Sequence, residues 1–405
     1  MDKSNLKVVV MGLGYIGLPT AALIASKGIN VLGVDINHKV VETVNKGEIH
    51  ILEPDLDGLV HEVVKKGYLK ASTSPQQADI FLITVPTPFK GNYVPDLSYV
   101  ESAIKMIIPY LEEGNLIIIE STSPIGTTES MYKFILQERP ELKDKIYMAY
   151  CPERVLPGKI LYELQFNDRV IGGINPQSSQ KAKEFYSLFV KGELYETDAK
   201  TAEMCKLVEN AYRDVNIAFA NELSLICDKA GINVWELIRL ANKHPRVNIL
   251  MPGVGVGGHC IAVDPWFLIT QYPKESRLMK TARKVNLYKT EWVINKIKEK
   301  AKEFEKETGR KPKIACLGLT YKPDIDDLRE SPALYIVRRL ISEEYDVLPV
   351  EPHIQKIDDI KLYELEDALE KADIIAVLVA HKIFKHLKIK GKPVLDFCGA
   401  LQTYE

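Results

Sequence analysis

A single cysteine follows a run of glycines in the stretch GVGVGGHC, residues 253–260, and this combination points to chemistry at Cys260. Glycine permits bends and close approaches that a side chain forbids, so either a ligand or another part of the chain packs against this loop. If a helix begins near Asp264, its dipole and any nearby cation would lower the pKa of the thiol and favour the nucleophilic thiolate. Most lone cysteines are small buried hydrophobes, but few follow such a loop, so we predict a nucleophile. The adjacent His259 has no second ligand at metal spacing, and we expect no metal site.

A second glycine motif, GLGYIG, directly follows an apolar run near the start of the chain. Gly12, Gly14 and Gly17 form the pattern G-x-G-x-x-G, which permits a tight turn, close approach of a pyrophosphate and close packing of a helix on a strand. The free N–H groups at the start of that helix would bind the phosphates. Asp35 ends the next apolar run, where its carboxylate can accept hydrogen bonds from a ribose diol. No arginine stands beside Asp35 to bind a 2′-phosphate, so the pattern predicts NAD rather than NADP.

Two threonines lie in proline-containing loops that follow further apolar runs. Thr87 belongs to TVPTP (84–88) and Thr122 to ESTSPIG (120–126). Ligands of open parallel sheets bind at the carboxyl ends of the strands, so these side chains could contact the cofactor or a water molecule. The spacing alone is equally consistent with ordinary loops.

Lys206 and Asn210 are four positions apart in a helical pattern and therefore share a helix face. Because that face lies opposite the apolar stripe of the same helix, the pattern by itself favours two solvated side chains.

Charged residues gather in LTYKPDIDDLRESPAL, residues 319–334, which includes Lys322, Arg329 and three aspartates. Ser331 and Pro332 are typical of the N-cap and first residue of a helix. The basic groups would suit a diphosphate, although a surface charge cluster explains the pattern equally well.

The elements that must position these residues follow an α/β order. Short, continuously apolar runs alternate with helical patterns over 1–197, which is typical of a parallel sheet covered on both faces. The expected strands there are 7–12, 31–35, 80–85 and 116–121, and the expected helices are 17–27 and, after Asp96 as N-cap, 97–112. Strand patterns stop over 198–308, where we expect one helix within 202–232, closed by Gly231 as C-cap, and another at 291–308. They resume over 309–405, with expected strands at 313–321, 346–352, 372–380 and 393–397. We therefore predict three domains with these boundaries.

Composition and charge limit the function further. A net charge of −2 without a long Lys/Arg run gives no reason to expect a nucleic-acid or membrane-surface partner. The chain starts in a strand-like run without a signal-peptide pattern, and its apolar runs are far shorter than the roughly 20 residues that span a bilayer. Six scattered cysteines without a CxxC pair are typical of reduced thiols, so we expect a cytoplasmic protein.

Seven motifs occur in order along the chain: GLGYIGLP, TVPTP, STSPIGTTE, CPERVLPG, KLVENAYRDVNIAFANEL, GVGVGGHCIAVDP and LGLTYKPDIDDLRESPA. In this order the chain resembles the UDP-glucose/GDP-mannose dehydrogenase family over essentially its whole length. The resemblance implies two Rossmann-like domains, the N-terminal one for NAD and the C-terminal one for a UDP-sugar. It also implies a central long-helix domain that carries active-site residues and forms a homodimer or higher homo-oligomer. One departure is Glu351, where aspartate is commoner, and it casts no doubt on the active site.

The resemblance further implies a four-electron oxidation of the C6 alcohol of the sugar by two NAD⁺, through a thiohemiacetal and a thioester on the cysteine. PERVLPG and HPRVNI, together with GGHCIAVDPWF, are most similar to members that convert UDP-N-acetyl-D-mannosamine to its uronate for polysaccharide biosynthesis. UDP-glucose, UDP-N-acetylglucosamine and GDP-mannose remain alternative substrates. A two-electron hydroxyacid dehydrogenase and a non-catalytic NAD-binding sensor remain alternative functions.

The resemblance finally assigns roles to individual residues. It implies that Cys260 is the nucleophile, that Lys206 and Asn210 turn toward the reacting carbon, and that Asp264 orients Lys206 or a water. Glu153 and Thr122 would handle the hydrolytic water. The implied NAD contacts are Gly12, Gly14, Tyr15, Ile16, Gly17, Asp35, Thr87 and Arg329. The implied sugar-nucleotide contacts are Arg154, Val155, Lys206, Asn210, Arg213, His244, Arg246, Gly257, Tyr321 and Lys322.

Overall fold

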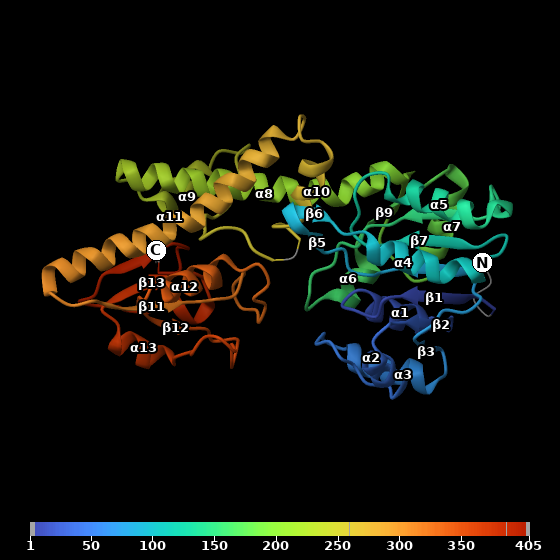
Figure 1. Cartoon of the computed structure of the whole chain (residues 1–405), viewed down its shortest axis with the longest axis horizontal. Coiled ribbons are helices and arrows are strands. Elements are labelled where there is room, and N and C mark those ends of the chain that lie inside the picture. Colours follow the sequence, from blue (N-terminus) through green and yellow to red (C-terminus); the bar gives the residue numbers. More distant parts are fainter. Residues whose placement is uncertain (1–4, 259, 386, 402–405) are drawn as a thin grey trace. The chain divides into compact units, whose positions relative to one another are not determined.

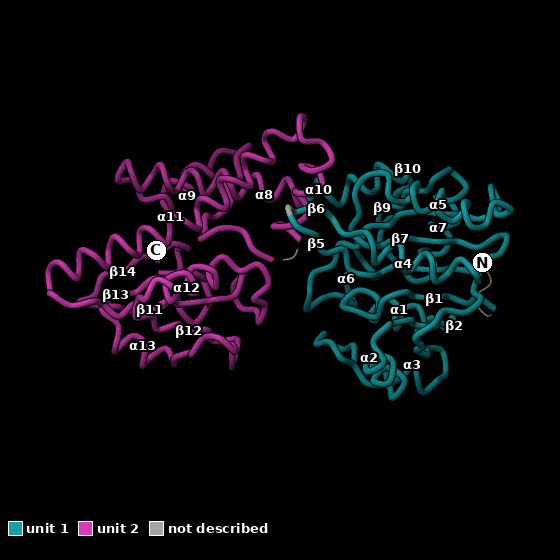
Figure 2. Tube along the Cα trace, in the orientation of Figure 1, with its two compact units in different colours: residues 1–209 teal, residues 210–405 magenta. Residues whose placement is uncertain are grey.

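The computed structural model describes residues 5–258, 260–385 and 387–401. It divides into two compact units, residues 1–209 and 210–405 (Figure 2). His259, for which we expected no role as a metal ligand, lies outside the described residues. The predicted three-domain boundaries stay a prediction.

The first unit contains an eight-stranded sheet with the order β10-β9-β8-β7-β4-β1-β2-β3 (Figure 1). Its strands are β1 (Lys7–Met11), β2 (Asn30–Val34), β3 (Leu69–Ser72), β4 (Ile80–Ile83), β7 (Leu116–Ile119), β8 (Tyr147–Tyr150), β9 (Arg169–Gly173) and β10 (Leu194–Asp198). Its helices are α1 (Gly17–Ala25), α2 (His38–Asn45), α3 (Leu56–Lys65), α4 (Ser98–Ile107), α5 (Thr127–Glu138), α6 (Ile160–Phe166) and α7 (Pro176–Tyr186). A small hairpin of β5 (Phe89–Lys90) and β6 (Val94–Pro95) follows β4. The four strands predicted from apolar runs are confirmed as β1, β2, β4 and β7.

The prediction of a parallel sheet is wrong at one edge. Strand β9 pairs antiparallel with β8, and β10 runs parallel to β9, so these two strands oppose the other six. Neither has a continuous apolar run: β10 lies at the sheet edge and is mostly exposed, and β9 ends in two glycines. Those glycines are needed for packing, because a Cβ at Gly173 would lie 2.4 Å from the backbone nitrogen of Ser179.

The core of the first unit lies on both faces of the sheet because side chains alternate along each strand. Val8 and Val10 of β1 pack with residues of α1, α6 and α7, whereas Val9 and Met11 pack with residues of α4 and α5. Because the helices cover the two faces, the carboxyl ends of the strands are bordered by the connecting loops.

The second unit combines long helices with a four-stranded parallel sheet of order β12-β11-β13-β14 (Figure 1). The helix α8 (Ala199–Ala230) runs from the first unit into the second, where α9 (Val234–Ala241), α10 (Asp264–Gln271) and α11 (Arg277–Thr308) follow. The sheet consists of β11 (Lys313–Leu317), β12 (Asp346–Val350), β13 (Ile374–Val377) and β14 (Val394–Asp396), with helices α12 (Pro332–Ser342) and α13 (Leu365–Lys371). The long helix and the four C-terminal strands are therefore confirmed. No helix in the described part of the chain is long and apolar enough to cross a membrane.

The helix expected at 291–308 begins much earlier in the structure, at Arg277. The sequence did not reveal its first half, because that half is buried through polar contacts rather than through an apolar stripe. The Arg283 guanidinium and the Asn286 amide both donate to the Asp214 carboxylate on α8, at 2.7 and 2.8 Å. The Lys289 ammonium donates to the Ser224 hydroxyl at 2.7 Å. Apolar periodicity, the signal used to place the helix, is absent from such a surface.

Both sheets contain the same local arrangement, which confirms two Rossmann-like domains. In the first, Gly12 makes a turn at φ +97°, and the Asp35 carboxylate accepts the N–H of Leu13 at 3.0 Å. In the second, Gly318 makes a turn at φ +90°, and the Glu351 carboxylate accepts the N–H of Leu319 at 2.7 Å. Each acid ends the strand beside the turn and fixes the glycine loop.

Candidate active site

The dinucleotide site predicted from the glycine motif lies at the carboxyl edge of the first sheet. Strands β7, β4 and β1 are neighbours there, so the turn after β1 meets the loops that carry Thr87 and Thr122. The hydroxyl of Thr84 donates to the carbonyl oxygen of Gly12 at 2.8 Å, and that of Ser121 donates to the carbonyl of Val85 at 2.7 Å. Thr87 and Thr122 are half-buried at this edge, and their contacts with ligand stay a prediction.

The three glycines have distinct surroundings that fit a bound pyrophosphate. A Cβ at Gly17 would lie 1.8 Å from the carbonyl oxygen of Gly12, so only glycine allows α1 to pack here. A Cβ at Gly14 would meet nothing within 4 Å, which leaves room for a ligand to approach the backbone. The exposed Tyr15 and the half-buried Ile16 complete the turn. The residues present therefore fit NAD, with the Asp35 carboxylate at the position expected for the ribose.

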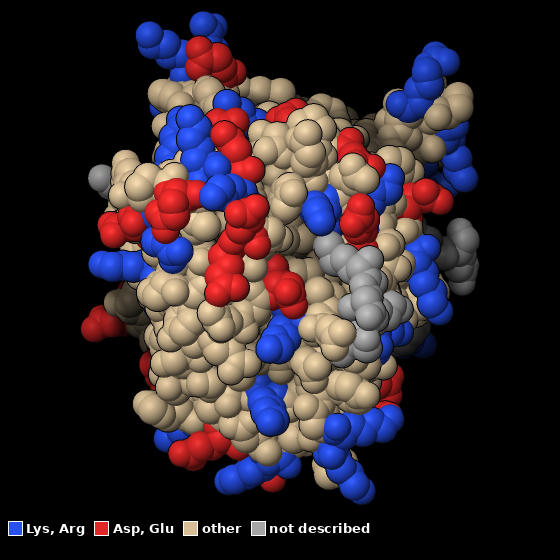
Figure 3. All heavy atoms as spheres, turned by 90° about the vertical axis from the view of Figure 1, so that its right-hand side faces the viewer, with Lys and Arg blue, Asp and Glu red and all other residues tan. Residues whose placement is uncertain are grey.

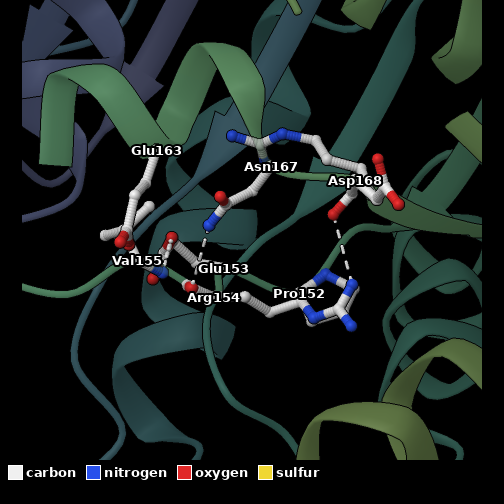
Figure 4. Close-up of a pocket in the computed structure, with 8 residues that line it drawn as sticks. Pro152, Glu153, Arg154, Val155, Glu163, Asn167 and Asp168 are labelled. Carbon is white, nitrogen blue, oxygen red and sulfur yellow. Dashed lines mark hydrogen bonds between the residues drawn. The ribbon is translucent and has the colours of Figure 1, made fainter. Parts of the chain in front are cut away.

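Glu153 lies in a pocket of the first unit (Figure 4). The lining residues are Pro152, Glu153, Arg154, Val155, Glu163, Asn167, Asp168 and Arg169. The Glu153 carboxylate is buried and accepts the N–H of Val155 at 2.6 Å, and the Lys206 ammonium donates to the carbonyl oxygen of Glu153 at 2.6 Å. Burial raises the pKa of the Glu153 carboxyl, while the charges of Lys206 and Arg169 oppose the rise. A carboxyl with a raised pKa suits a residue that exchanges protons near neutral pH.

The loop around Glu153 is fixed by two acidic residues that the sequence did not indicate, Glu53 and Glu209. The Glu53 carboxylate, which follows α2 in the chain, accepts the N–H groups of Gly158 and Ile160 at 2.8 and 2.7 Å. The Arg154 guanidinium pairs with Glu209 at 2.7 Å and donates to a backbone carbonyl at 3.2 Å. Glu53 is separated from the loop by about a hundred residues, so no local motif predicts these contacts.

The glycines before Cys260 pack against protein in the second unit. A Cβ at Gly257 would lie 2.5 Å from the carbonyl oxygen of Glu330 and 2.7 Å from the Cβ of Tyr321. One at Gly258, which has φ +81°, would lie 2.7 Å from the Tyr321 ring. The start of the loop is fixed as well, because Asn221 accepts the N–H of Gly253 at 2.9 Å. Gly257 and Gly258 thus bring the cysteine loop against the segment that contains Tyr321, and the sugar-nucleotide contact of Gly257 stays a prediction.

Cys260 is half-buried in the turn that leads into α10, four residues before its start at Asp264, which confirms the predicted helix start. The carbonyl oxygen of Cys260 accepts the N–H groups of Val263 and Asp264 at 3.0 and 2.8 Å. The Asp264 carboxylate is buried and accepts the amide N–H of Asn210 at 2.6 Å. The nucleophile, the buried acid and the amide thus come together within the second unit.

The interpretation of Lys206 and Asn210 as solvated side chains is wrong. Both are half-buried, Lys206 with its ammonium on the carbonyl of Glu153 and Asn210 with its amide on Asp264. The helical pattern could not indicate this, because the partners come from distant segments. A contact of Asp264 with Lys206 or a water stays a prediction.

The remaining predicted ligand contacts lie on exposed or half-buried parts of the second unit. Tyr321 is half-buried, Lys322 is exposed, and Arg329 pairs with Asp327 at 2.6 Å. Ser331 accepts the N–H of Leu334 at 3.2 Å and so confirms the predicted N-cap of α12. Arg213, His244 and Arg246 are exposed. Their ligand contacts, and the NAD contact of Arg329, stay predictions.

One group of metal-ligand residues occurs in the described part of the chain, namely Asp324, His353 and His381. Both ring nitrogens of His381 have protein partners: Nδ1 accepts the N–H of Asp324 at 2.9 Å, and Nε2 lies 3.2 Å from the Glu351 carboxylate. These contacts explain the buried histidine without a metal, and the expected absence of a metal site stays a prediction.

Two Rossmann-like sheets in one chain, with a cysteine held ahead of a helix, define a nucleotide-dependent dehydrogenase. Residues 6–190 match the NAD binding domain of the UDP-glucose/GDP-mannose dehydrogenase family, 200–288 match its central domain, and 315–403 match its UDP binding domain. The chain belongs to this family, and NAD is its cofactor.

Several relatives match over nearly their full length. The chain is 56% identical to a UDP-N-acetyl-D-mannosamine dehydrogenase of Campylobacter jejuni, over 98% of this chain and 100% of the relative. It is 52% identical to an NDP-N-acetyl-D-galactosaminuronic acid dehydrogenase of Ralstonia nicotianae, over 97% and 95%. Among solved structures, a UDP-N-acetyl-mannosamine dehydrogenase of Staphylococcus aureus is 42% identical with a TM-score of 0.85, over 98% and 96%.

Proposed function

We propose that this protein is a UDP-N-acetyl-D-mannosamine 6-dehydrogenase, which oxidises the C6 alcohol of its substrate to a carboxylate with two NAD⁺ and one water. Relatives that carry this activity in their names match at 53–56% identity over nearly the whole chain. The observation that carries the proposal is the placement of Cys260 in the turn that leads into α10, where its carbonyl accepts the N–H of the buried Asp264, whose carboxylate accepts from Asn210 in the same unit.

The chemistry accounts for the residue types. When bound, NAD⁺ supplies the hydride acceptor, and the alcohol proton leaves with a base as the aldehyde forms. An aldehyde cannot lose a second hydride until it becomes tetrahedral, and the Cys260 thiolate achieves this by adding to the carbonyl carbon. Oxidation of the resulting thiohemiacetal gives a thioester, which water cleaves to the carboxylate and the free thiol. We leave the base of the first oxidation open between Lys206 and a water held by Asp264.

The other residues stabilise or complete these steps. Lys206 and Asn210, one turn apart on α8, would donate hydrogen bonds to the developing oxyanion, each contributing about 3 kcal/mol. Glu153, with Thr122, would position and deprotonate the water that cleaves the thioester, and its buried carboxyl is suited to this task. The predicted sugar-nucleotide contacts of Tyr321 and Lys322 would hold the substrate through its UDP group.

The stoichiometry of NADH production tests the proposal directly. We expect two NADH per sugar with UDP-N-acetyl-D-mannosamine, and higher kcat/KM for it than for UDP-N-acetylglucosamine, UDP-N-acetylgalactosamine, UDP-glucose or GDP-mannose. One NADH per sugar would instead support a two-electron dehydrogenase. Cys260→Ala should abolish uronate formation and leave NAD binding intact. Cys398→Ala, the matched cysteine control, should leave both unchanged. Full activity of Cys260→Ala would contradict the thioester route, and no activity on any sugar would support a sensor.

We also propose a homodimer or higher homo-oligomer. Tyr212, Phe219 and Ile226 of α8 recur every seven residues, which places them on one helix face, and their exposed fractions are 68%, 57% and 58%. A large apolar stripe of this kind is typical of an interface. Light scattering should report an oligomer for the native chain and a smaller species for Phe219→Asp, while Ile383→Asp, at an exposed site elsewhere, should change nothing.

The mixed surface charge and the cysteines support the remaining proposals. Basic and acidic side chains are interspersed on the face in Figure 3, which offers no continuous basic band to a nucleic acid on that face. Cys151, Cys227 and Cys316 are buried free thiols, in keeping with a reducing compartment. We therefore propose a cytoplasmic enzyme that acts without nucleic acid.

A further inference from the structure

A buried charged cluster lies behind the Glu153 pocket and has no part in the chemistry proposed above. It consists of Glu120 directly after β7, Arg169 at the start of β9 and Tyr186 at the end of α7, and we call it the Glu120 cluster. All three side chains are at least nine-tenths buried, with exposed fractions of 3%, 4% and 0%. A buried ion pair is a poor source of stability unless its geometry is excellent, so its retention calls for a reason.

Within the cluster, Glu120 has a short hydrogen bond from Tyr186 and only a long contact with Arg169. The Tyr186 hydroxyl donates to Glu120 Oε1 at 2.5 Å, whereas the nearest guanidinium nitrogen of Arg169 lies 3.7 Å from the same oxygen. Within the described residues, Glu120 Oε2 and Arg169 Nε have no hydrogen-bond partner. The guanidinium also lies 5.0 Å from the centre of the Tyr186 ring, where the ring face attracts a cation. The Arg169 charge is therefore only partly neutralised by Glu120.

Arg169 connects the cluster with Glu153, because both residues line the same pocket. Arg169 is attracted to both carboxyls, so Glu120 and Glu153 compete for one buried cation. The charge of Arg169 lowers the pKa of Glu153, and the charge of Glu120 raises it. The charge of Lys206 on α8 also favours the ionised form of Glu153. Cys151 lies beside Arg169, with its sulfur 3.8 Å from a guanidinium nitrogen.

The other charged groups around the pocket already have partners of their own. Glu163 accepts the N–H of Leu156 at 2.7 Å, and Asp168 accepts the N–H of Glu193 at 2.9 Å. Arg154 pairs with Glu209, as described above. Glu120 is therefore the buried carboxylate best placed to offset Arg169 near Glu153.

We propose that Glu120 is a positioning residue that sets the protonation of Glu153 by offsetting the charge of Arg169. Burial raises the pKa of the Glu120 carboxyl, and the charge of Arg169 and the hydrogen bond from Tyr186 oppose that rise. The inference rests on the proposed function for its catalytic meaning, because Glu153 is there the group that activates the hydrolytic water. Without the Glu120 charge, Arg169 faces Glu153 alone and stabilises its carboxylate. Glu153 then becomes a weaker base, ionised at lower pH.

The test is an infrared titration of the Glu153 carboxyl, assigned by the difference between the native chain and Glu153→Gln. Glu120→Gln keeps the shape of the side chain and an acceptor for Tyr186, and it should lower the Glu153 midpoint by about one pH unit. Tyr186→Phe should lower it by less, because it weakens the ionisation of Glu120 without removing the group. The double variant should match Glu120→Gln alone, since Tyr186 acts through Glu120. Glu113→Gln, an exposed site with the same change of charge, should leave the midpoint unchanged.

The outcomes separate this inference from the proposed function. An unchanged or raised midpoint in Glu120→Gln, or additive shifts in the double variant, overturns the role of the Glu120 cluster whatever the activity. Quenched mass spectrometry measures the rate at which the acyl adduct on Cys260 decays. In a plot of this rate against pH, the acid limb should move by the same amount as the infrared midpoint of Glu153. If the midpoint moves and the acid limb does not, the cluster controls Glu153 as inferred and the proposed hydrolytic role of Glu153 is wrong. Thermal unfolding of each variant checks that the change is electrostatic rather than a loss of folding.

Discussion

Replacement of Gly258 by alanine should destabilise the protein through a clash that can be traced to one ring. The φ of +81° is costly for any residue with a Cβ, by about 1–2 kcal/mol. The new Cβ would lie 2.7 Å from one carbon of the Tyr321 ring and 3.0 Å from the next, so the ring must move by several tenths of an ångström. Overpacking of this kind lowers the free energy of unfolding by about 1–3 kcal/mol. Alanine also reduces the conformational entropy of the unfolded chain, which raises the free energy of unfolding by about 0.4–1 kcal/mol. The expected decrease in the free energy of unfolding is therefore about 1–5 kcal/mol.

Urea unfolding, followed by tryptophan fluorescence and extrapolated to water, measures this decrease. Gly253→Ala is the matched control in the same loop, because its Cβ would meet nothing within 4 Å and its φ is not positive. Tyr321→Ala should recover part of the loss in combination with Gly258→Ala, since it removes the clashing ring but not the backbone strain. If Gly258→Ala and Gly253→Ala cost the same, or if Tyr321→Ala recovers nothing, the packing of the cysteine loop on Tyr321 is not what requires glycine. Rates of NADH production should fall with Gly258→Ala and stay near normal with Gly253→Ala.

Three further predictions follow from the described contacts. Gly14→Ala should unfold like the native chain in urea, because its Cβ would meet no protein atom within 4 Å, yet fluorescence titration should show at least tenfold weaker binding of NAD. Gly17→Ala should fail to fold, because its Cβ would lie only 1.8 Å from the backbone oxygen of Gly12. Asp214→Ala should lower the free energy of unfolding by about 3–5 kcal/mol in urea, since it leaves the buried Arg283 charge unpaired, and a loss below 1 kcal/mol would contradict a buried ion pair. Burial lowers the pKa of Lys289 to about 7 from 10.5, so the unfolded chain binds more protons between these values. The free energy of unfolding should therefore rise with pH above about 7, by up to about 1.4 kcal/mol per unit, and Lys289→Met should remove that slope.

The nucleotide fold was largely predictable because its signals are local. The spacing of Gly12, Gly14 and Gly17 after a strand dictates a turn, an opening and a close contact, and each was found at its glycine. Strands covered on both faces are continuously apolar, which made β1, β4 and β7 visible in the sequence. The edge strand β10 and the first half of α11 lack such patterns, because one is exposed and the other is buried through polar contacts.

The candidate site was predictable in its residue types and not in its contacts. Resemblance assigned Lys206 and Asn210 to the site, while the helical pattern alone placed them in solvent. The structure gives each a partner, the carbonyl of Glu153 and the carboxylate of Asp264, from segments more than fifty positions away. Side-chain direction is set by such distant partners, so periodicity within one helix cannot decide it.

By itself, the sequence determined that this chain carries a dinucleotide turn at Gly12, a second α/β domain and a cysteine behind a glycine loop. Those features follow from backbone sterics and apolar spacing, which act over a few residues. Only the tertiary structure decided that the glycine loop serves the packing of Tyr321, and that Glu120 and Arg169 lie together in the core behind Glu153. These contacts depend on which distant segments pack side by side, and that depends on burial across the whole fold.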